Sequence, residues 1–336
     1  MSVRRDSPTL RTATLGGVVG RRLAAAPFLI LAALTLVFLM IQAVPGEPFH
    51  DAAGPGVDPQ ALEHLRNLFQ PDIPLGKRYL RWLGQIASGD LGFSTALRRS
   101  VGPLVLEAGA NTVRLVGVVL VFQFVAGVVG GCVAAAGRGR WIDTTVRSAS
   151  AISYATPGFV VGLGLIAIFA SGLGWLPATQ MESIDVAAMS TWAAVVDRLR
   201  HLVMPCLALG IPGAAAVALY TRETLGAVLD RPFLQGARSR GLGPARVLLR
   251  HGLRNSLLPI VQLFGLSLPG LVGGSVVVET LFAWPGMGRL AYHAVLARDE
   301  PLVLGCTLLA VVGVLLGSLV ADLLSAALDP RIREHP

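Results

Sequence analysis

Long apolar stretches alternate with polar segments along the chain, and this alternation predicts how it folds. A helix needs about 20 apolar residues to cross the ~30 Å hydrocarbon core of a bilayer. Six stretches approach or exceed that length: residues 23–44, 108–136, 150–172, 203–221, 257–278 and 301–328. We therefore predict an all-α integral membrane protein with six spans and an extramembrane segment, residues 45–107, after the first.

The first apolar stretch follows a basic N-terminal segment, and a cleaved signal peptide has the same order. This stretch is longer than the apolar region of a signal peptide. In addition, Ile41-Gln42-Ala43 lacks the small residue that cleavage requires two places before Ala43. We predict an uncleaved first span.

One proline and several glycine pairs in the later spans predict a kink and close helix contacts. Pro157 interrupts the third span and predicts a kink, because proline removes a helical hydrogen bond. Glycines recur four positions apart, which allows helices to approach closely. The pairs are Gly127/Gly131, Gly158/Gly162, Gly270/Gly274 and Gly313/Gly317.

The sequence pattern of residues 45–107 predicts helices that lie on a surface. Asp58-Pro59 has the pattern of a helix N-cap followed by proline at the first helical position. Short amphipathic helices lie on a membrane or protein surface. Gly89–Ser94 predicts a turn. Two apolar stripes at helical spacing lie between these features: Leu62, Leu65, Leu68 and Phe69, then Leu75, Tyr79, Trp82, Leu83 and Ile86.

The basic residues are distributed unevenly, and this predicts an orientation. Basic residues accumulate in the cytoplasmic loops of membrane proteins. We therefore predict that both termini are cytoplasmic and that residues 45–107 are extracytoplasmic. The counts are 17 Lys and Arg in the 78 residues of segments 1–22, 137–149, 222–256 and 329–336, against 10 in the 115 residues of segments 45–107, 173–202 and 279–300.

The composition agrees with a membrane protein. Of the 336 residues, 53% are hydrophobic and 14% are charged, whereas a soluble domain has about 25% charged residues. The net charge of +8 is spread over short loops, which argues against a nucleic-acid partner. Cys132, Cys206 and Cys306 are far apart in apolar stretches, so we predict no metal site, cofactor or disulfide.

The most basic inner segment is residues 222–256, between the fourth and fifth spans. A loop that merely follows the charge bias of membrane proteins explains its charge. In a mostly apolar chain it is also a natural binding place for a cytoplasmic partner. Two acids, Glu223 and Asp230, accompany seven arginines: Arg222, Arg231, Arg238, Arg240, Arg246, Arg250 and Arg254.

The motif in this segment is more specific than its charge. Gln235-Gly236-Ala237-Arg238-Ser239-Arg240-Gly241-Leu242 is followed by His251-Gly252-Leu253-Arg254-Asn255-Ser256-Leu257-Leu258-Pro259. This pattern resembles the cytoplasmic EAA loop of ABC importer permeases, in the form found in the dipeptide, oligopeptide and nickel branch. The general motif has a glutamate where Gln235 stands and a shorter Gly-to-Pro spacing, and both departures fit that branch.

The resemblance implies a short coupling helix near Gln235–Arg246 that docks on an ATPase, with Gly241 at a turn or a close contact. The residues that it assigns to ATPase coupling are Gln235, Gly236, Ala237, Arg238, Ser239, Arg240, Gly241, Leu242, Arg246, Arg250, Asn255 and Pro259.

Four further motifs are similar to motifs of the same family: Pro45–Pro48, Gly89–Ser94, Gly174–Ala178 and Glu279–Gly288. The resemblance extends from about Arg21 to Arg333 and implies the six-helix type I permease fold. It also implies a second, homologous permease subunit, two cytoplasmic ABC ATPases and an extracytoplasmic substrate-binding protein. The implied cargo is a peptide, or alternatively a nickel chelate or another small solute, carried across the cytoplasmic membrane of a prokaryote by alternating access.

The chain lacks the sequence elements of an ATPase. A phosphate-binding loop needs Gly-Lys-Ser/Thr, and the single lysine lies in Gly76-Lys77-Arg78. A stand-alone secondary transporter or channel, an intramembrane enzyme and an exporter remain as alternatives. Asp322, with Arg114 and Glu279 at span edges, gives few ionisable groups for a proton-coupled carrier. No pair of nucleophile and base stands out for an enzyme.

Overall fold

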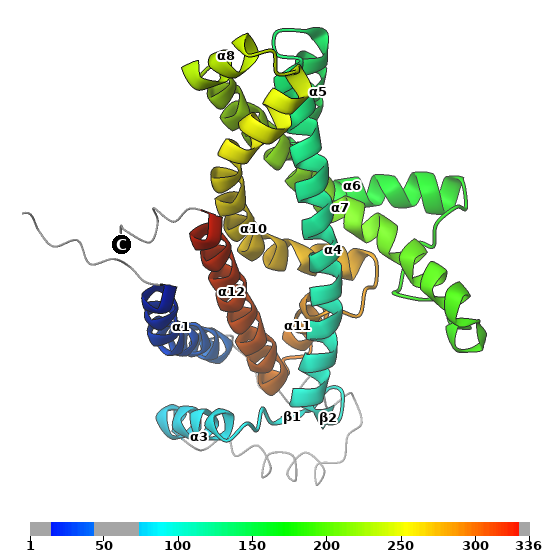
Figure 1. Cartoon of the computed structure of the whole chain (residues 1–336). Helices are drawn as coiled ribbons and strands as arrows, with labels where there is room; N and C mark the ends of the chain where they lie inside the picture. Colours follow the sequence, from blue (N-terminus) through cyan, green and yellow to red (C-terminus); the bar gives the residue numbers. More distant parts are fainter. Residues whose placement is uncertain (1–14, 44–73, 329–336) are drawn as a thin grey trace, which may run out of the picture.

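The computed structural model describes residues 15–43 and 74–328 of the chain. The predicted N-cap at Asp58-Pro59, the stripe from Leu62 to Phe69 and the C-terminal segment 329–336 lie outside these residues. Within them the chain is almost entirely helical (Figure 1).

The described residues contain four single helices that are long and apolar enough to cross a membrane: α1 (Leu15–Ala43), α4 (Val101–Ala136), α7 (Thr191–Leu229) and α12 (Glu300–Leu328). Two bent helix pairs meet the same criteria together. In one, α5 (Trp141–Ala155) continues after a 100° bend into α6 (Gly158–Leu165) and the π-helix η1 (Ile166–Gly172). In the other, α10 (Arg254–Leu281) bends by 49° between Pro259–Leu268 and Gly270–Leu281. If each bent pair is one span, the total is six, and the chain is an all-α integral membrane protein.

Several boundaries differ from those predicted. Helix α4 begins at Val101 rather than 108, and α5 begins at Trp141, inside the predicted loop 137–149. The kink expected at Pro157 is a full break of the helix, since Pro157 caps α6. Helix α7 has 39 residues and extends beyond the predicted span 203–221 at both ends. Hydropathy reports only the apolar part of a helix, so it misses polar turns that continue it.

One end of the molecule carries the amphipathic helix α3 (Leu75–Ala87) and a two-stranded antiparallel sheet, β1 (Phe93–Ser94) with β2 (Arg99–Ser100). Tyr79 and Trp82 of α3 pack on Phe38 of α1, with ring centroids 5.2 and 5.9 Å away. Strand β1 occupies the last two residues of the turn predicted at Gly89–Ser94, and neither strand was predicted. Ser94 Oγ donates to buried Asp299 just before α12, at 2.6 Å. The opposite end carries α8 (Pro232–Ser239) (Figure 1).

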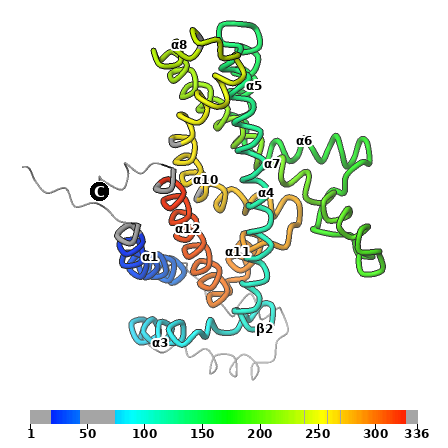
Figure 2. The backbone as a smooth tube through the Cα atoms, in the orientation of Figure 1, coloured from blue at the N-terminus to red at the C-terminus, as the bar shows by residue number. Residues whose placement is uncertain are grey.

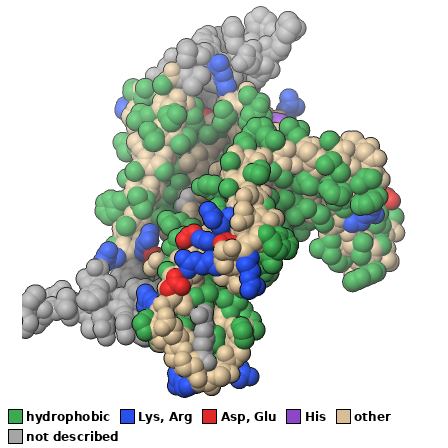
Figure 3. Space-filling view, turned by 90° about the horizontal axis from the view of Figure 1, so that it is seen from above, with side chains coloured by type: hydrophobic (Ala, Val, Ile, Leu, Met, Phe, Trp, Pro, Cys, Tyr) green, Lys and Arg blue, Asp and Glu red, His purple; other side chains and the backbone are tan. Residues whose placement is uncertain are grey.

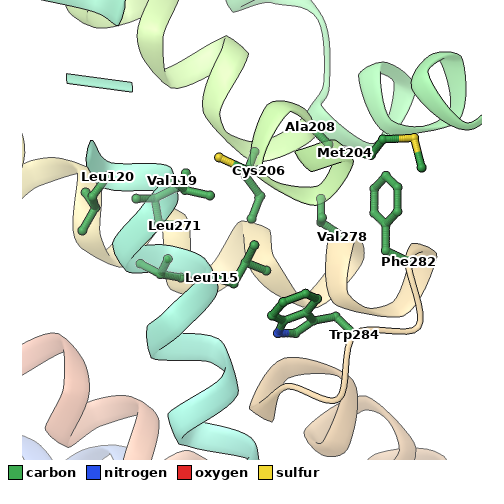
Figure 4. Close-up of a cluster of buried hydrophobic side chains, with 12 residues drawn as sticks. Leu115, Val119, Leu120, Met204, Cys206, Ala208, Leu271, Val278, Phe282 and Trp284 are labelled. Atoms are coloured by element: carbon green, nitrogen blue, oxygen red, sulfur yellow. The ribbon is translucent and has the colours of Figure 1, made fainter. Parts of the chain in front are cut away.

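The largest hydrophobic core joins α4, α7 and α10 (Figure 4). The tube in Figure 2 shows α4 and α7 crossing. Gly127 and Gly131 face α7 here, because a Cβ on either would lie 2.5 Å from the Cβ of Val217 or Thr221. This pair of glycines therefore permits the close approach of α4 and α7. Gly270 and Gly313 have open space instead, so the spacing does not mark a contact at those two positions. The labelled core residues in Figure 4 are Leu115, Val119, Leu120, Met204, Cys206, Ala208, Leu271, Val278, Phe282 and Trp284.

Candidate functional site

The predicted coupling segment, residues 222–256, is mostly helical rather than a loop. Helix α7 continues into this segment as far as Leu229, because Leu225 and Val228 keep helical spacing and are buried. The helices α8, α9 (Pro244–Arg246) and the π-helix η3 (Val247–Leu253) follow, and η3 runs directly into α10. The implied coupling helix is therefore α8, which is shorter than the Gln235–Arg246 segment expected and begins earlier.

Helix α8 has one buried and one exposed face. Leu234 and Ala237 are buried, 0% and 4% exposed, against Val228 of α7 and Val247 of η3. The exposed face carries Phe233, Gln235, Gly236 and Ser239. A Cβ on Gly236 would have no neighbour within 4 Å. The helix is thus fixed to the body of the protein on one side and open to a partner on the other.

Gly241 ends α8. Its φ is +80°, a left-handed conformation that glycine adopts readily and side chains with a Cβ do not. The Leu242 N–H donates to the Ala237 carbonyl at 3.4 Å, and the Leu242 side chain packs against the buried cluster that includes Ala237. These features are those of a Schellman C-terminal cap. No atom lies within 4 Å of a Cβ built on Gly241, so the position is a turn and not a close contact.

Two ion pairs join the end of α7 to the α4–α5 corner, one to Asp143 in the first turn of α5 and one to Arg138 in the turn before it. Arg222 donates to both carboxylate oxygens of Asp143, at 3.0 Å from Nε and 2.8 Å from Nη2. The two side chains are 12% and 4% exposed. Arg138 donates to Asp230 at 2.7 Å nearer the surface. Because a bidentate pair also fixes orientation, the end of α7 that carries α8 is held to the base of α4 and α5.

The π-helix η3 packs closely on α7. A Cβ on Gly252 would lie 2.8 Å from Leu225 Cδ1, so only glycine fits there without a shift. Asn255 is exposed at the start of α10 and donates to the His251 carbonyl at 2.6 Å. Pro259 lies within α10, in its second turn. The second half of the predicted motif therefore forms the junction between the α8 region and α10.

The six arginines of this segment whose side chains the structure describes fall into two groups. Arg222 pairs with Asp143, which lies outside the segment, and with Glu223 beside it. Five others are exposed and form no ion pair in the described part of the chain: Arg231, Arg240, Arg246, Arg250 and Arg254. Figure 3, which views the molecule from above, shows blue side chains gathered near the centre of the face with a few red ones among them. This end of the molecule therefore offers unpaired positive charge beside the open face of α8.

A second polar cluster, at the far end of α10, was not predicted as a site. Glu279 is fully buried and accepts hydrogen bonds from Thr112 Oγ1 at 2.8 Å and from the Arg289 N–H at 3.0 Å. The Trp284 indole donates to the Asn111 carbonyl at 3.1 Å. A Cβ on Gly286 would collide with the Glu279 carboxylate. These contacts explain the Glu279–Gly288 motif as a cluster that ties α10, α4 and α11 (Met287–Leu296) together.

The sequence of this chain is similar to those of known transport proteins. Residues 127–334 match the family described as binding-protein-dependent transport system inner membrane component. The oligopeptide transport system permease protein AppB of Bacillus subtilis (strain 168) is 34% identical over 316 residues, 94% of this chain and 98% of that protein. The glutathione transport system permease protein GsiC of Escherichia coli O6:H1 is 35% identical over 319 residues, 95% of this chain and 99% of that protein. The region matched to the family includes α8 and the Glu279–Gly288 motif, whereas Asn111 and Thr112 of α4 precede it.

Proposed function

The chain belongs to the family of binding-protein-dependent transport system inner membrane components, and from that premise we propose how it carries its cargo. It is a permease subunit of an ABC importer that works with ATPase and substrate-binding protein partners. We propose a complex with a second, homologous permease subunit, two cytoplasmic ATPases and one extracytoplasmic binding protein. ATP hydrolysis takes place on the ATPase chains.

The proposed cargo is a peptide. One relative is named for oligopeptide transport and another for glutathione transport, and this chain covers nearly their whole length. Both relatives are therefore named for the transport of peptides. A nickel chelate or another small solute is the alternative.

The observation that carries the coupling proposal is the two-faced helix α8. Its buried face, Leu234 and Ala237, fixes it to α7 and η3, so a force applied to α8 moves those helices too. Its exposed face and the neighbouring arginines are open to an ATPase. The proposed contact residues are Gln235, Gly236, Ser239, Arg240, Arg246, Arg250 and Asn255, with Gly241 and Leu242 forming the cap. When ATP closes the ATPase pair, α8 moves, and the permeases alternate between outward and inward states.

The proposed orientation follows from the same geometry. The end with α8 faces the cytoplasm, where an ATPase is found. The opposite end, with α3 and the β1–β2 pair, faces outward toward the binding protein (Figure 1). Both termini are then cytoplasmic, in agreement with the arginine bias.

A reconstitution experiment tests this function. The permease pair, the ATPases and the binding protein are placed in proteoliposomes, and uptake of radiolabelled trialanine is measured with and without ATP. We expect uptake only with ATP and all components, and no nucleotide binding by this chain alone. Uptake by this chain without the ATPases would contradict the proposal and favour a secondary transporter or channel.

A further inference from the structure

A cavity of about 520 Å³ lies between α4, α7, α10 and the α5–α6 bend. This volume is within the range of sites that bind small molecules. The described residues that line it include Gln123, Tyr154 and Ser267, together with small and apolar side chains, and none of them is charged. The cavity is separate from the α8 region, since none of its lining residues belongs to the coupling segment.

Gln123 is the unusual residue of this wall. Its side chain is 1% exposed, and its amide nitrogen Nε2 is buried with no hydrogen-bond partner among the described residues. A Cβ on Gly213 would collide with its Oε1, so α7 carries glycine where the amide group lies. A buried donor without a partner is costly, and more so at membrane depth where no bulk water is present. The unpaired Gln123 amide therefore indicates that the site binds a polar group of a ligand.

The helices around this cavity are interrupted near it. The chain bends by 100° between α5 and α6, and α10 bends by 49° beside Gly270. Pro212 in α7 lacks the N–H that would donate to the Ala208 carbonyl, and Gly158 packs against that carbonyl, where a Cβ would lie 2.8 Å away. Figure 2 shows the curve of α10. Irregular backbone at membrane depth is tolerated where it is buried in protein or lines a cavity.

We propose that this cavity is the share of the cargo path that this chain provides, and that Gln123 Nε2 donates a hydrogen bond to a peptide-bond carbonyl of the cargo. The inference rests on the proposed peptide import. A peptide backbone supplies a neutral carbonyl acceptor whatever its side chains are, which suits a wall with a single unpaired amide donor and no charge. A transport site must also release its cargo, and one neutral hydrogen bond binds weakly enough for that.

A substitution in the complete, reconstituted complex tests the role of Gln123. Gln123→Met keeps the length of the side chain and removes the donor. Its matched control is Val125→Met on the same helix, because Val125 is 60% exposed and does not line the cavity. We expect Gln123→Met to lower the rate of trialanine uptake about fivefold, the loss of one net hydrogen bond, and Val125→Met to leave it unchanged. Equal uptake by assembled Gln123→Met and wild-type complexes would overturn the inference.

A second measurement covers the case in which Gln123→Met does not assemble. A photo-crosslinking amino acid replaces Leu266, which lines the cavity and is 76% exposed, in an otherwise unchanged complex. The control position is Leu316 of α12, which is 58% exposed and outside the cavity. We expect labelled trialanine to be captured at residue 266 and not at 316 during ATP turnover. Capture of the second permease alone at residue 266 would show that the cavity is a subunit interface.

The two proposals fail in different ways. If wild-type complex takes up no trialanine, the proposed peptide cargo is wrong and this inference falls with it. If the wild type takes up trialanine but the results at Gln123 and Leu266 are negative, only the inference is wrong.

Discussion

Substitutions at Gly241 give the most direct test of coupling through α8. The left-handed conformation costs an L-residue roughly 1–2 kcal/mol, and Gly241 adopts it with φ +80°. Because nothing lies within 4 Å of a Cβ there, this backbone cost is the whole effect within the chain. It lowers the ratio of correctly capped α8 to other conformations by about 5–30-fold. A β-branched side chain makes the same conformation costlier still.

The expected order of damage follows from this cost. Gly241→Asn should be mildest, because asparagine visits the left-handed region. Gly241→Ala should be intermediate, and Gly241→Val should abolish uptake and reduce the amount of ATPase that co-purifies. Insertion of the spans should not change, because the residue lies at the proposed cytoplasmic end. The measurements are trialanine uptake and ATPase pull-down, on variants present in the membrane at normal levels.

Gly243 supplies the matched control. It is two residues away, also has open space around a Cβ, and has an ordinary φ of −61°. Gly243→Val should therefore transport close to the wild-type rate. Wild-type transport by Gly241→Val, or equal damage from the two valine substitutions, would refute the argument from the cap.

Four further outcomes are expected. A cysteine at Asp185 should react with an impermeant thiol reagent in intact cells and one at Ser239 should not, and the reverse result would invert the proposed orientation. Asp143→Asn should lower the Tm of the purified complex in detergent, because Arg222 loses its bidentate partner, and the exchange Asp143→Arg with Arg222→Asp should recover part of the loss if the pair itself is what matters. Gly131→Val should destabilise the α4–α7 contact by about 1–3 kcal/mol or more and reduce folded yield, since a Cβ there lies 2.7 Å from the Ala218 carbonyl, whereas Gly117→Val has open space and should fold normally. Arg240→Ala should reduce uptake less than Gly241→Ala, because an exposed ion pair with an ATPase contributes about 1 kcal/mol at most.

The all-α membrane class could be predicted from the sequence, because the length of an apolar stretch is read directly from the order of its residues. The ends of helices were harder. The turns at Arg222–Leu229 continue α7 through Leu225 and Val228, whose partners are on α4, η3 and α8 and cannot be recognised from hydropathy. The break at Pro157 was expected only as a kink, since the size of a bend depends on what packs beside it.

The sequence was sufficient to locate the candidate site along the chain, but it predicted few of the contacts between its residues. The motif located α8, and the choice of glycine at residue 241 indicated a turn. Its positive charge was seen, but the pairing of Arg222 with Asp143 joins residues far apart in sequence. Gln123 gave no signal, because one glutamine in an apolar span becomes informative only when the structure shows that its amide has no partner.

Helix α7 also has a mechanical consequence. Its 39 residues form a rod of about 58 Å at 1.5 Å per residue. One end is clamped by Arg222 and Asp143, while Pro205 and Pro212 weaken the middle by removing backbone hydrogen bonds. A rod that is stiff at its clamped end and compliant at its centre concentrates strain at the centre when it is pushed. A load applied at α8 would therefore be released as bending beside Ala208 and Gly213, tens of ångströms from where it was applied.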